Sequence, residues 1–234
     1  SPSVRRRFMD ILISQVDRSY LRALQRYQHV VTQRNHLLRL IRDHRSSKQE
    51  LDFWDAELVK EGTSISTRRE EVVERLTPFV TSSYADLTNS QENFSLSYQP
   101  TVVSSELAKA LESHRDREIG AGMTLIGPHR DDLVIEIAGM RSGIFASRGQ
   151  ARTIALALRL AEAVFLKDMR GEEPVLLLDD VLSEMDTERR HHVLREAGKY
   201  QQALVTTAEP ALIQDSPIQP SAVLTVHKGV VTGL

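Results

Sequence analysis

Hydrophobic positions near the start of the chain repeat with the spacing of a coiled-coil helix. Between residues 17 and 43 they recur in alternating steps of four and three, and Arg34 is the one polar residue in the row. This heptad spacing keeps one stripe of a helix against a partner helix. The row consists of Tyr20, Leu24, Tyr27, Val31, Leu38 and Ile41.

A second helix is predicted after the polar residues 44–47. Two helices joined by a short polar turn form an antiparallel hairpin. Gly62 lies within the second helix, where glycine is about 1 kcal/mol less favourable than alanine, and this weakens the prediction of an unbroken helix. With a lead-in helix near residues 5–14, residues 1–92 are expected to form a helical arm domain. The apolar positions of the second helix repeat every seven residues, at Leu51, Leu58, Ile65, Val72 and Phe79.

From residue 93 onward, short apolar strands alternate with helices. This alternation indicates a buried sheet with parallel strands, so residues 93–234 are expected to form an α/β domain. The segment 127–132 is expected to join two strands as a hairpin or corner. Strands are predicted at 94–98, 123–126, 133–137, 175–178, 203–206, 223–226 and 230–232, and helices at 105–117, 150–168 and 186–200.

Composition excludes several classes of protein. The chain has no cysteine, which excludes disulfide frameworks, zinc thiolate sites and cysteine nucleophiles. Its formal net charge of -2 excludes a uniformly basic, histone-like DNA binder. No apolar run approaches the ~18 residues of a membrane span and no signal peptide opens the chain, so a cytoplasmic protein without a membrane partner is expected.

The charge is nevertheless unevenly distributed. Residues 1–48 contain eleven Lys and Arg against three Asp and Glu, whereas residues 49–118 contain seven against fourteen. This asymmetry predicts a positive surface on the first arm helix that suits nucleic acid. Alternatively, Glu57, Glu61, Glu70 and Glu74 of the second arm helix neutralise it. The candidate DNA-binding residues are Arg22, Arg26, Arg39 and Arg42.

Two carboxylates follow the apolar residues 175–178, at Asp179 and Asp180. In α/β sheets, ligands bind at the carboxyl ends of the strands. A nucleotide-hydrolysing site of the Walker B type needs one carboxylate to help hold Mg²⁺ and another to orient or deprotonate water beside the γ-phosphate. The alternative is a strand that runs into a solvated acidic turn.

The residues before the helix at 150–168 suit an anion. Ser147 can cap the helix, Gly149 lets a ligand approach the backbone, and the exposed N–H groups attract phosphate. A Walker B-like strand follows this helix, and Ser183 and Asp186 come after the strand. Signature loop, helix, Walker B strand and D-loop follow one another in this order in ABC-type ATPases.

Three motifs resemble the RecF family, bacterial DNA replication and repair proteins related to SMC-type ABC ATPases. They are G-P-H-R-D-D-L at 127–133, S-R-G-Q at 147–150 and L-D-D-V-L-S-E-M-D at 178–186. Residues 1–10 and 33–38 also resemble the family, so the likeness spans nearly the whole chain. It implies an antiparallel helical-hairpin arm followed by the C-terminal lobe of an ABC-type ATPase head.

The resemblance also implies residue roles. Asp179 would bind Mg²⁺, and Asp180 would be the catalytic carboxylate, where most ABC proteins have Glu. Thr207 stands where many have a switch histidine, and His129 with Arg130 is a candidate phosphate sensor or else an ion-paired corner. Ser183 and Asp186 would form the D-loop. The signature residues Ser147, Arg148, Gly149 and Gln150 would contact ATP bound by the opposite subunit, although Arg148 stands where transporters have Gly.

The family's P-loop, G-x-x-x-x-G-K-[ST], does not occur in these 234 residues. The resemblance implies that it lies in an N-terminal lobe and that this chain is a fragment, which alone should bind ATP weakly and not hydrolyse it. The intact protein is then expected to be a weak ATPase.

The resemblance further implies an ATP-dependent homodimer with ATP and Mg²⁺ as cofactors. This dimer would bind gapped DNA at junctions of single strand and duplex, and would act with RecO and RecR to load RecA in DNA repair, replication restart and the SOS response. One alternative is a nucleotide-binding subunit of a transporter, but the helical arm is not typical of that class. Another is an SMC-like structural tether, but arms of ~45 Å are too short for a chromosome-scale tether.

Overall fold

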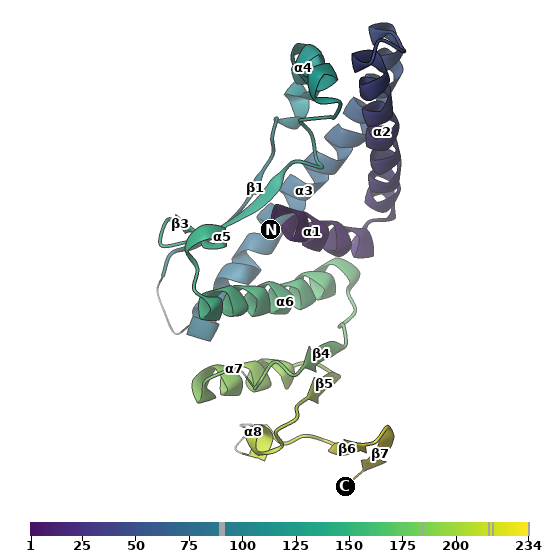
Figure 1. The fold of residues 1–234 in the computed structure, drawn as a ribbon. Helices are drawn as coiled ribbons and strands as arrows, with labels where there is room; N and C mark the ends of the chain where they lie inside the picture. Colours follow the sequence, from purple (N-terminus) through teal and green to yellow (C-terminus); the bar gives the residue numbers. More distant parts are fainter. Residues whose placement is uncertain (89–91, 184, 215, 217, 234) are drawn as a thin grey trace.

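The computed structural model describes residues 1–88, 92–183, 185–214, 216 and 218–233. The molecule is elongated, with a helical arm at one end and the C-terminal strands at the other (Figure 1). Three helices open the chain: α1 (Pro2–Val16), α2 (Arg18–Arg42) and α3 (Leu51–Thr88), with the short 3-10 helix η1 (Lys48–Glu50) before α3. Helices α2 and α3 form the predicted antiparallel hairpin, and α1 crosses its base.

The seam of α2 is buried as the heptad pattern predicts. Tyr20, Tyr27 and Leu38 are each at most 2% exposed, and Arg34 is fully buried in the same row. Leu24 and Val31 are only partly buried and lie at the edge of the seam. Its remaining buried residues are Ala23, Val30, Leu37 and Ile41.

Helix α3 runs unbroken through Gly62 for 38 residues. A Cβ atom at Gly62 would lie 2.9 Å from Leu107 Cδ2 and 3.2 Å from Tyr27 Cε2. Because two neighbouring elements press against this point of the helix, the residue has no room for a side chain. Close packing therefore explains the glycine, and the helix continues through it.

The far half of α3 packs on the α/β part of the chain. A single hydrophobic core runs from Met9 and Tyr27 through Ile65 to Phe165 and Val193, and so crosses the predicted domain boundary at residue 92. A small separate cluster lies at the arm tip and consists of Leu37, Leu38, Ile41 and Leu51. The arm therefore shares its core with the rest of the chain, except at the tip.

A three-stranded antiparallel sheet in the order β1-β2-β3 follows the arm. It contains β1 (Phe94–Gln99), β2 (Asp132–Ile137) and β3 (Met140–Arg141). Between β1 and β2 lie the 3-10 helix η2 (Ser104–Glu106) and α4 (Leu107–Ala121). Strand β2 pairs with β1 along its whole length, with Phe94 opposite Ile137 and Gln99 opposite Asp132.

The strand predicted at 123–126 is wrong. The Thr124 N–H donates to Asn35 Oδ1 at 2.7 Å, and the Leu125 N–H donates to Glu118 Oε1, also at 2.7 Å. Because side chains of α2 and α4 take these backbone donors, they are not available for a strand ladder. Of the hairpin or corner expected at 127–132, the chain forms the corner, and β2 pairs with β1.

The remaining predicted elements follow in the expected order, with two short helices, α5 and α8, that were not predicted. They are α5 (Ser142–Phe145), α6 (Arg148–Arg170), β4 (Leu176–Asp179), α7 (Thr187–Ala197), β5 (Ala203–Thr206), α8 (Ala211–Gln214), β6 (Leu224–His227) and β7 (Val230–Gly233). Strand β4 pairs in parallel with β5, whereas β6 and β7 form an antiparallel hairpin. The expected burial of the parallel sheet holds for one face only, since Leu176 and Leu178 are buried but Leu177 is 69% exposed.

Candidate nucleotide site and arm surface

The two candidate catalytic residues lie at the carboxyl end of β4, where Thr206 of β5 contacts the Asp179 carboxylate and the Asp180 backbone. Thr206 Oγ1 donates to Asp179 Oδ1 at 2.6 Å and accepts from the Asp180 N–H at 3.1 Å. Asp180 has a φ of 50°, in the left-handed region that non-glycine residues rarely occupy. Such backbone strain is common at functional sites. Sequence analysis missed Thr206, which the pairing of β4 with β5 places opposite Asp179.

The D-loop residues organise the chain after β4. Ser183 Oγ donates to the Asp180 carbonyl at 3.1 Å, which closes the turn behind the carboxylates. Asp186 caps α7, because its Oδ1 accepts from the Arg189 N–H at 2.9 Å. Glu184 of the same motif lies outside the described residues. The Thr207 hydroxyl oxygen accepts from the Glu209 N–H at 3.1 Å and so faces its own loop.

The signature residues form the N-terminus of α6. Ser147 Oγ accepts from the Gln150 N–H at 3.2 Å, and Gln150 Oε1 accepts from the Ser147 N–H at 2.9 Å, which together make a capping box. Ser147, Arg148 and Gly149 are all exposed. A Cβ at Gly149 would meet only Ser147 Oγ, at 3.9 Å, among the described atoms. Internal packing therefore does not require this glycine, and the open space suits a phosphate at a helix N-terminus.

The signature and the carboxylates lie apart within one chain. Helix α6 begins on the left of Figure 1, whereas β4 lies below the right-hand end of that helix. A helix of 23 residues is about 35 Å long. The structure therefore does not bring Ser147 and Asp179 together around one small ligand.

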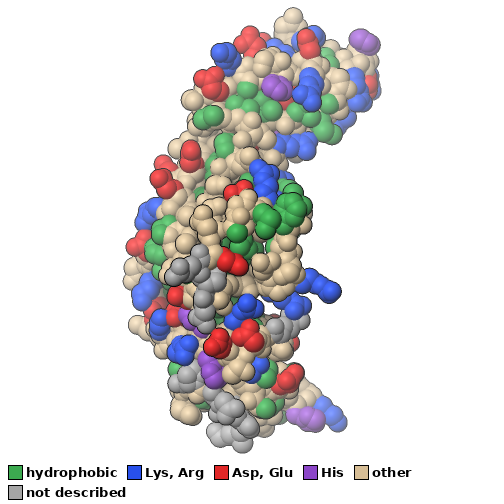
Figure 2. All heavy atoms as spheres, turned by 90° about the vertical axis from the view of Figure 1, so that its left-hand side faces the viewer, with side chains coloured by type: hydrophobic (Ala, Val, Ile, Leu, Met, Phe, Trp, Pro, Cys, Tyr) green, Lys and Arg blue, Asp and Glu red, His purple; other side chains and the backbone are tan. Residues whose placement is uncertain are grey.

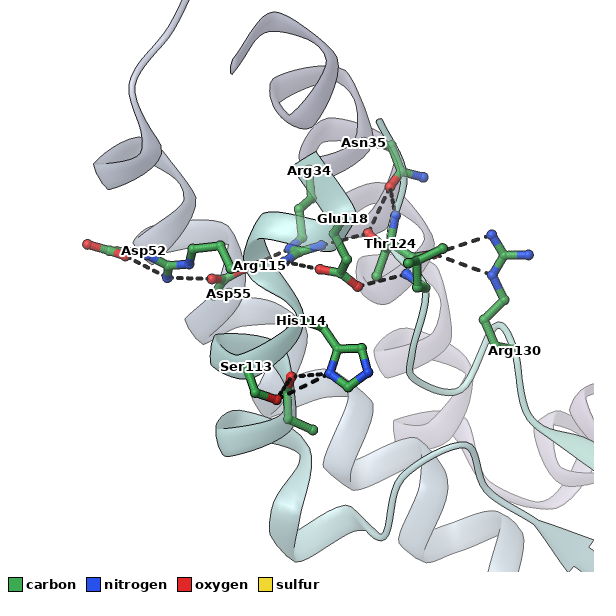
Figure 3. Close-up of polar contacts among 12 residues, drawn as sticks. Arg34, Asn35, Asp52, Asp55, Ser113, His114, Arg115, Glu118, Thr124 and Arg130 are labelled. Atoms are coloured by element: carbon green, nitrogen blue, oxygen red, sulfur yellow. Dashed lines mark hydrogen bonds and ion pairs between the residues drawn. The ribbon is translucent and has the colours of Figure 1, made fainter. Parts of the chain in front are cut away.

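His129 belongs to the buried corner between β2 and the arm. Its Nε2 donates to the Thr124 carbonyl at 3.2 Å, which leaves Nδ1 to accept from the Tyr27 hydroxyl at 2.8 Å. Burial lowers the pKa of His129 to about 4, so the ring is neutral at pH 7. Arg130 is exposed, and its guanidinium donates to the same carbonyl at 3.3 Å (Figure 3).

The two aspartates after Arg130 tie this corner to its neighbours. Asp132 receives two hydrogen bonds from Arg5 of α1, at 2.8 and 2.6 Å. Asp131 is 1% exposed, and its Oδ1 accepts from the N–H and the hydroxyl of Thr101 at 2.7 and 2.9 Å. These contacts support the ion-paired corner, and a sensor role for His129 and Arg130 stays a prediction.

The candidate DNA-binding arginines differ in their surroundings. Arg26 forms a bidentate pair with Glu61 of α3, at 2.8 and 2.9 Å, as the neutralisation alternative expects. Arg42 Nε lies 3.3 Å from Asp43 Oδ1. Arg22 and Arg39 are exposed. The four arginines therefore do not form one uniform surface.

Arg34 is the centre of a buried ionic network in the arm (Figure 3). It contacts Asp55 and Glu118 at 2.7 Å each and donates to Thr124 Oγ1 at 2.9 Å. Arg115 of α4 reaches Asp55 from the other side at 2.7 Å. The polar residue in the predicted seam is thus buried because carboxylates from α3 and α4 surround it.

Comparison with known proteins gives one consistent result. A DNA replication and repair protein RecF from Herpetosiphon aurantiacus is 44% identical over 213 residues, which are 89% of this chain and 55% of that protein. A protein of the same name from Moorella thermoacetica is 42% identical over 229 residues, which are 97% of this chain and 62% of that protein. The chain is a homologue of the RecF proteins. No family model matches the sequence.

The solved structures agree with the RecF likeness. A structure of the recombination mediator protein RecF with ATP, in the RecFOR pathway, matches with a TM-score of 0.85 and 29% identity. The match covers 100% of this chain and 63% of the RecF chain. The predicted fold, a helical arm followed by part of an ABC-type ATPase head, is thereby confirmed. This homologue spans about 55–65% of the length of the RecF relatives that it matches.

The described part of this RecF homologue contains neither a helix that could span a membrane nor a cluster of metal-binding side chains. None of its helices combines the length and the apolar character that a membrane span requires. No group of three or more His, Cys, Asp or Glu side chains in the described residues could hold a metal ion. A nucleotide-bound Mg²⁺ needs fewer protein ligands, because one or two carboxylates and the phosphates hold it. Asp179 fits that arrangement.

Proposed function

We propose that this chain is the arm and the signature-bearing part of an ATP-dependent DNA-binding protein of recombinational repair and replication. The carboxylate pair Asp179–Asp180, held by Thr206 at the end of β4, carries this proposal. The similarity to a RecF with ATP over the whole chain supports it.

In this proposal the two carboxylates have different tasks. Mg²⁺ would neutralise charge on the β- and γ-phosphates and orient them for attack by water. Asp179 would hold the ion directly or through water, with its orientation fixed by Thr206. Asp180 would accept a hydrogen bond from the attacking water and orient it. Aspartate is one methylene shorter than the glutamate of most ABC proteins, which is in keeping with slow hydrolysis.

The signature residues would complete the site of a second copy. Because Ser147 and Asp179 lie toward opposite ends of α6, ATP held at the carboxylates of one subunit would meet the signature loop of the other. The N–H groups at the start of α6 and the Ser147 hydroxyl would then bind the γ-phosphate. ATP binding would close a homodimer, with Ser183 and Asp186 near its interface, and hydrolysis would open it.

The proposed substrate is DNA, and the partners are those of the RecFOR pathway. Helix α2 contains no Asp or Glu between Arg18 and Arg42, which supports DNA binding by its exposed surface. The proposed role is to bind gapped DNA in the cytoplasm and, with RecO and RecR, to promote RecA loading in repair, in the SOS response and at stalled replication. The matched structure is named as a recombination mediator of that pathway.

The test is a fusion of this chain to the part of the Moorella thermoacetica relative that it does not match, which we propose contains the P-loop. The fusion should hydrolyse ATP, and Asp180→Asn should keep ATP affinity within about 3-fold while slowing hydrolysis at least about 100-fold and accumulating a nucleotide-bound dimer. Asp168→Asn, which removes an exposed carboxylate from α6, is the matched control and should behave like the parent. The proposal is overturned if Asp180→Asn hydrolyses ATP at the parental rate.

A further inference from the structure

Helix α2 presents two different flanks beside its buried seam. The outer flank carries Arg22, Arg26, His29, Gln33 and His36, and the inner flank carries Leu21, Leu24, Gln28, Asn35, Arg39 and Arg42. Each set follows steps of three and four residues and therefore occupies one side of the helix. The outer flank is partly neutralised, since Arg26 is paired with Glu61, and the His29 ring lies 6.3 Å from that of Trp54.

The inner flank borders a cavity of about 700 Å³ between α1, α2 and the corner. Its walls are largely apolar, from Ile11, Leu21, Leu24 and Pro128, and Gln28 and Ser14 add polar groups. This volume lies within the range of about 300–1,000 Å³ that is usual for small-molecule sites. The cavity is therefore large enough for a nucleotide.

The floor of this cavity is fixed by buried hydrogen bonds. Tyr27 is held by His129, and Arg69, which is 2% exposed, donates to the Pro128 carbonyl at 2.7 Å. Asp10 also lines the cavity, but Arg69 neutralises it at 2.8 Å. The site is thus preformed, and its one carboxylate does not repel an anion.

Cationic side chains follow the cavity up the arm. Arg6 and Arg7 of α1 line it directly; Arg7 is exposed, and Arg6 donates to the Asp131 carbonyl at 2.8 Å. Farther along, Arg39 and Arg42 lie within about 3 Å of the position that a Cβ of Gly122 would occupy. Arg130 of the corner is exposed as well, and its guanidinium donates to the Thr124 carbonyl (Figure 3). Figure 2 shows basic side chains gathered where the arm overhangs the rest of the molecule.

We infer that the inner flank of α2 binds single-stranded nucleic acid, with one unstacked nucleotide seated in the cavity between α1 and α2. The inference deepens the proposed DNA-binding function and rests on it. The arginines suit the phosphates, and the apolar walls can cover the face of a base. Bases in a duplex are stacked on both sides, so the cavity favours a single strand.

The test uses this chain with an oligothymidine that contains one 2-aminopurine, whose fluorescence rises when the base unstacks. Arg7→Gln with Arg39→Gln should weaken binding at least about 10-fold and flatten the salt slope by about 1.4, since each single-strand phosphate contact contributes about 0.7. Lys60→Gln with Arg75→Gln removes two exposed charges from α3 and is the matched control, with less than about a 2-fold effect. Leu21→Trp should fill the cavity, abolish the fluorescence rise and leave the salt slope unchanged.

Other outcomes contradict specific parts of this inference. The double variant Arg22→Gln, Arg26→Gln changes the outer flank. If it loses as much oligothymidine affinity as Arg7→Gln with Arg39→Gln, the assignment of binding to the inner flank is overturned. If the unmodified chain binds the oligonucleotide without a rise in 2-aminopurine fluorescence, no base is unstacked and the proposed nucleotide site in the cavity is overturned. If an acidic, leucine-containing peptide binds and Leu21→Trp abolishes only that binding, the cavity is a protein-docking site. Hydrolysis by the fusion without any single-strand binding by this chain would overturn the inference while the ATPase proposal stands.

Discussion

Arg34 of α2 and Glu118 of α4 form an ion pair in which both side chains are fully buried, with Nη2 and Oε2 2.7 Å apart. Asp55 of α3 contacts the same guanidinium, so one arginine joins α2, α3 and α4. Burying these charges requires each to keep its partners, because an uncompensated charge in the interior is strongly destabilising. The network thereby fixes how the three helices lie against one another.

Glu118→Gln should lower the free energy of unfolding by about 3–5 kcal/mol, because it removes one of the two carboxylates that compensate the buried charge of Arg34 and leaves only Asp55. Urea denaturation of this chain measures the change. Lys48→Gln breaks the exposed pair with Asp116 and should cost less than about 1 kcal/mol. Equal losses in the two variants would show that burial does not strengthen the Arg34 pair.

Gly62→Ala should destabilise the chain by about 1–3 kcal/mol, despite the higher helix propensity of alanine. The new methyl group would lie 2.9 Å from Leu107 Cδ2, and overpacking outweighs the propensity gain. Gly120→Ala is the matched control, since no atom lies within 4 Å of its Cβ position, and should stabilise α4 by about 0.5–1 kcal/mol. Thermal unfolding of both variants distinguishes packing from propensity.

His129 should make stability depend on pH between 6.5 and 4. The folded ring has a pKa of about 4, so below pH 6.5 the unfolded chain binds a proton that the folded chain does not. Stability from this group is complete above pH 6.5 and is lost as the pH falls toward 4, by about 2 kcal/mol between pH 7 and 4.5. In urea denaturation at pH 7 and pH 4.5, the variant His129→Gln should lack this part of the loss of stability. An unchanged pH dependence in the variant would contradict the assignment.

Asp180→Gly should raise the free energy of unfolding by about 0.5–1 kcal/mol, because glycine accepts a φ of 50° without strain. The fusion with the Moorella thermoacetica segment should at the same time lose ATP hydrolysis. Ala138→Gly is the matched variant, since Ala138 has the same φ in the β2–β3 turn, and it should gain stability and keep hydrolysis. A loss of stability in Asp180→Gly alone would show that its carboxylate holds the loop together.

The long periodic elements were predictable from the sequence because each repeats one local rule many times. The heptad rows gave α2 and α3, and the apolar run before Asp179 gave β4, within a few residues of their observed bounds. The capped start of α6 followed from Ser147, whereas the reciprocal contact of Gln150 was not predicted. In each case neighbouring residues contain the information.

Features that depend on distant partners were not predictable in this way. Residues 123–126 look like a strand until Asn35 and Glu118, which come from two other helices, take their backbone donors. Thr206 shares no motif with Asp179, and only the pairing of β4 with β5 brings them together. The pairing of Arg26 with Glu61 likewise needed the relative position of α2 and α3, which the sequence left as one of two alternatives.

Helix α3 is a single rod that extends from the arm tip into the part of the molecule that carries α6. Its 38 residues make it about 57 Å long. A lever of that length amplifies small rotations, and a tilt of the whole helix by about 5° at the α6 end displaces the arm tip by about 5 Å. Movements too small to repack the core around α6 would thus still alter the spacing between the two arms of the proposed dimer.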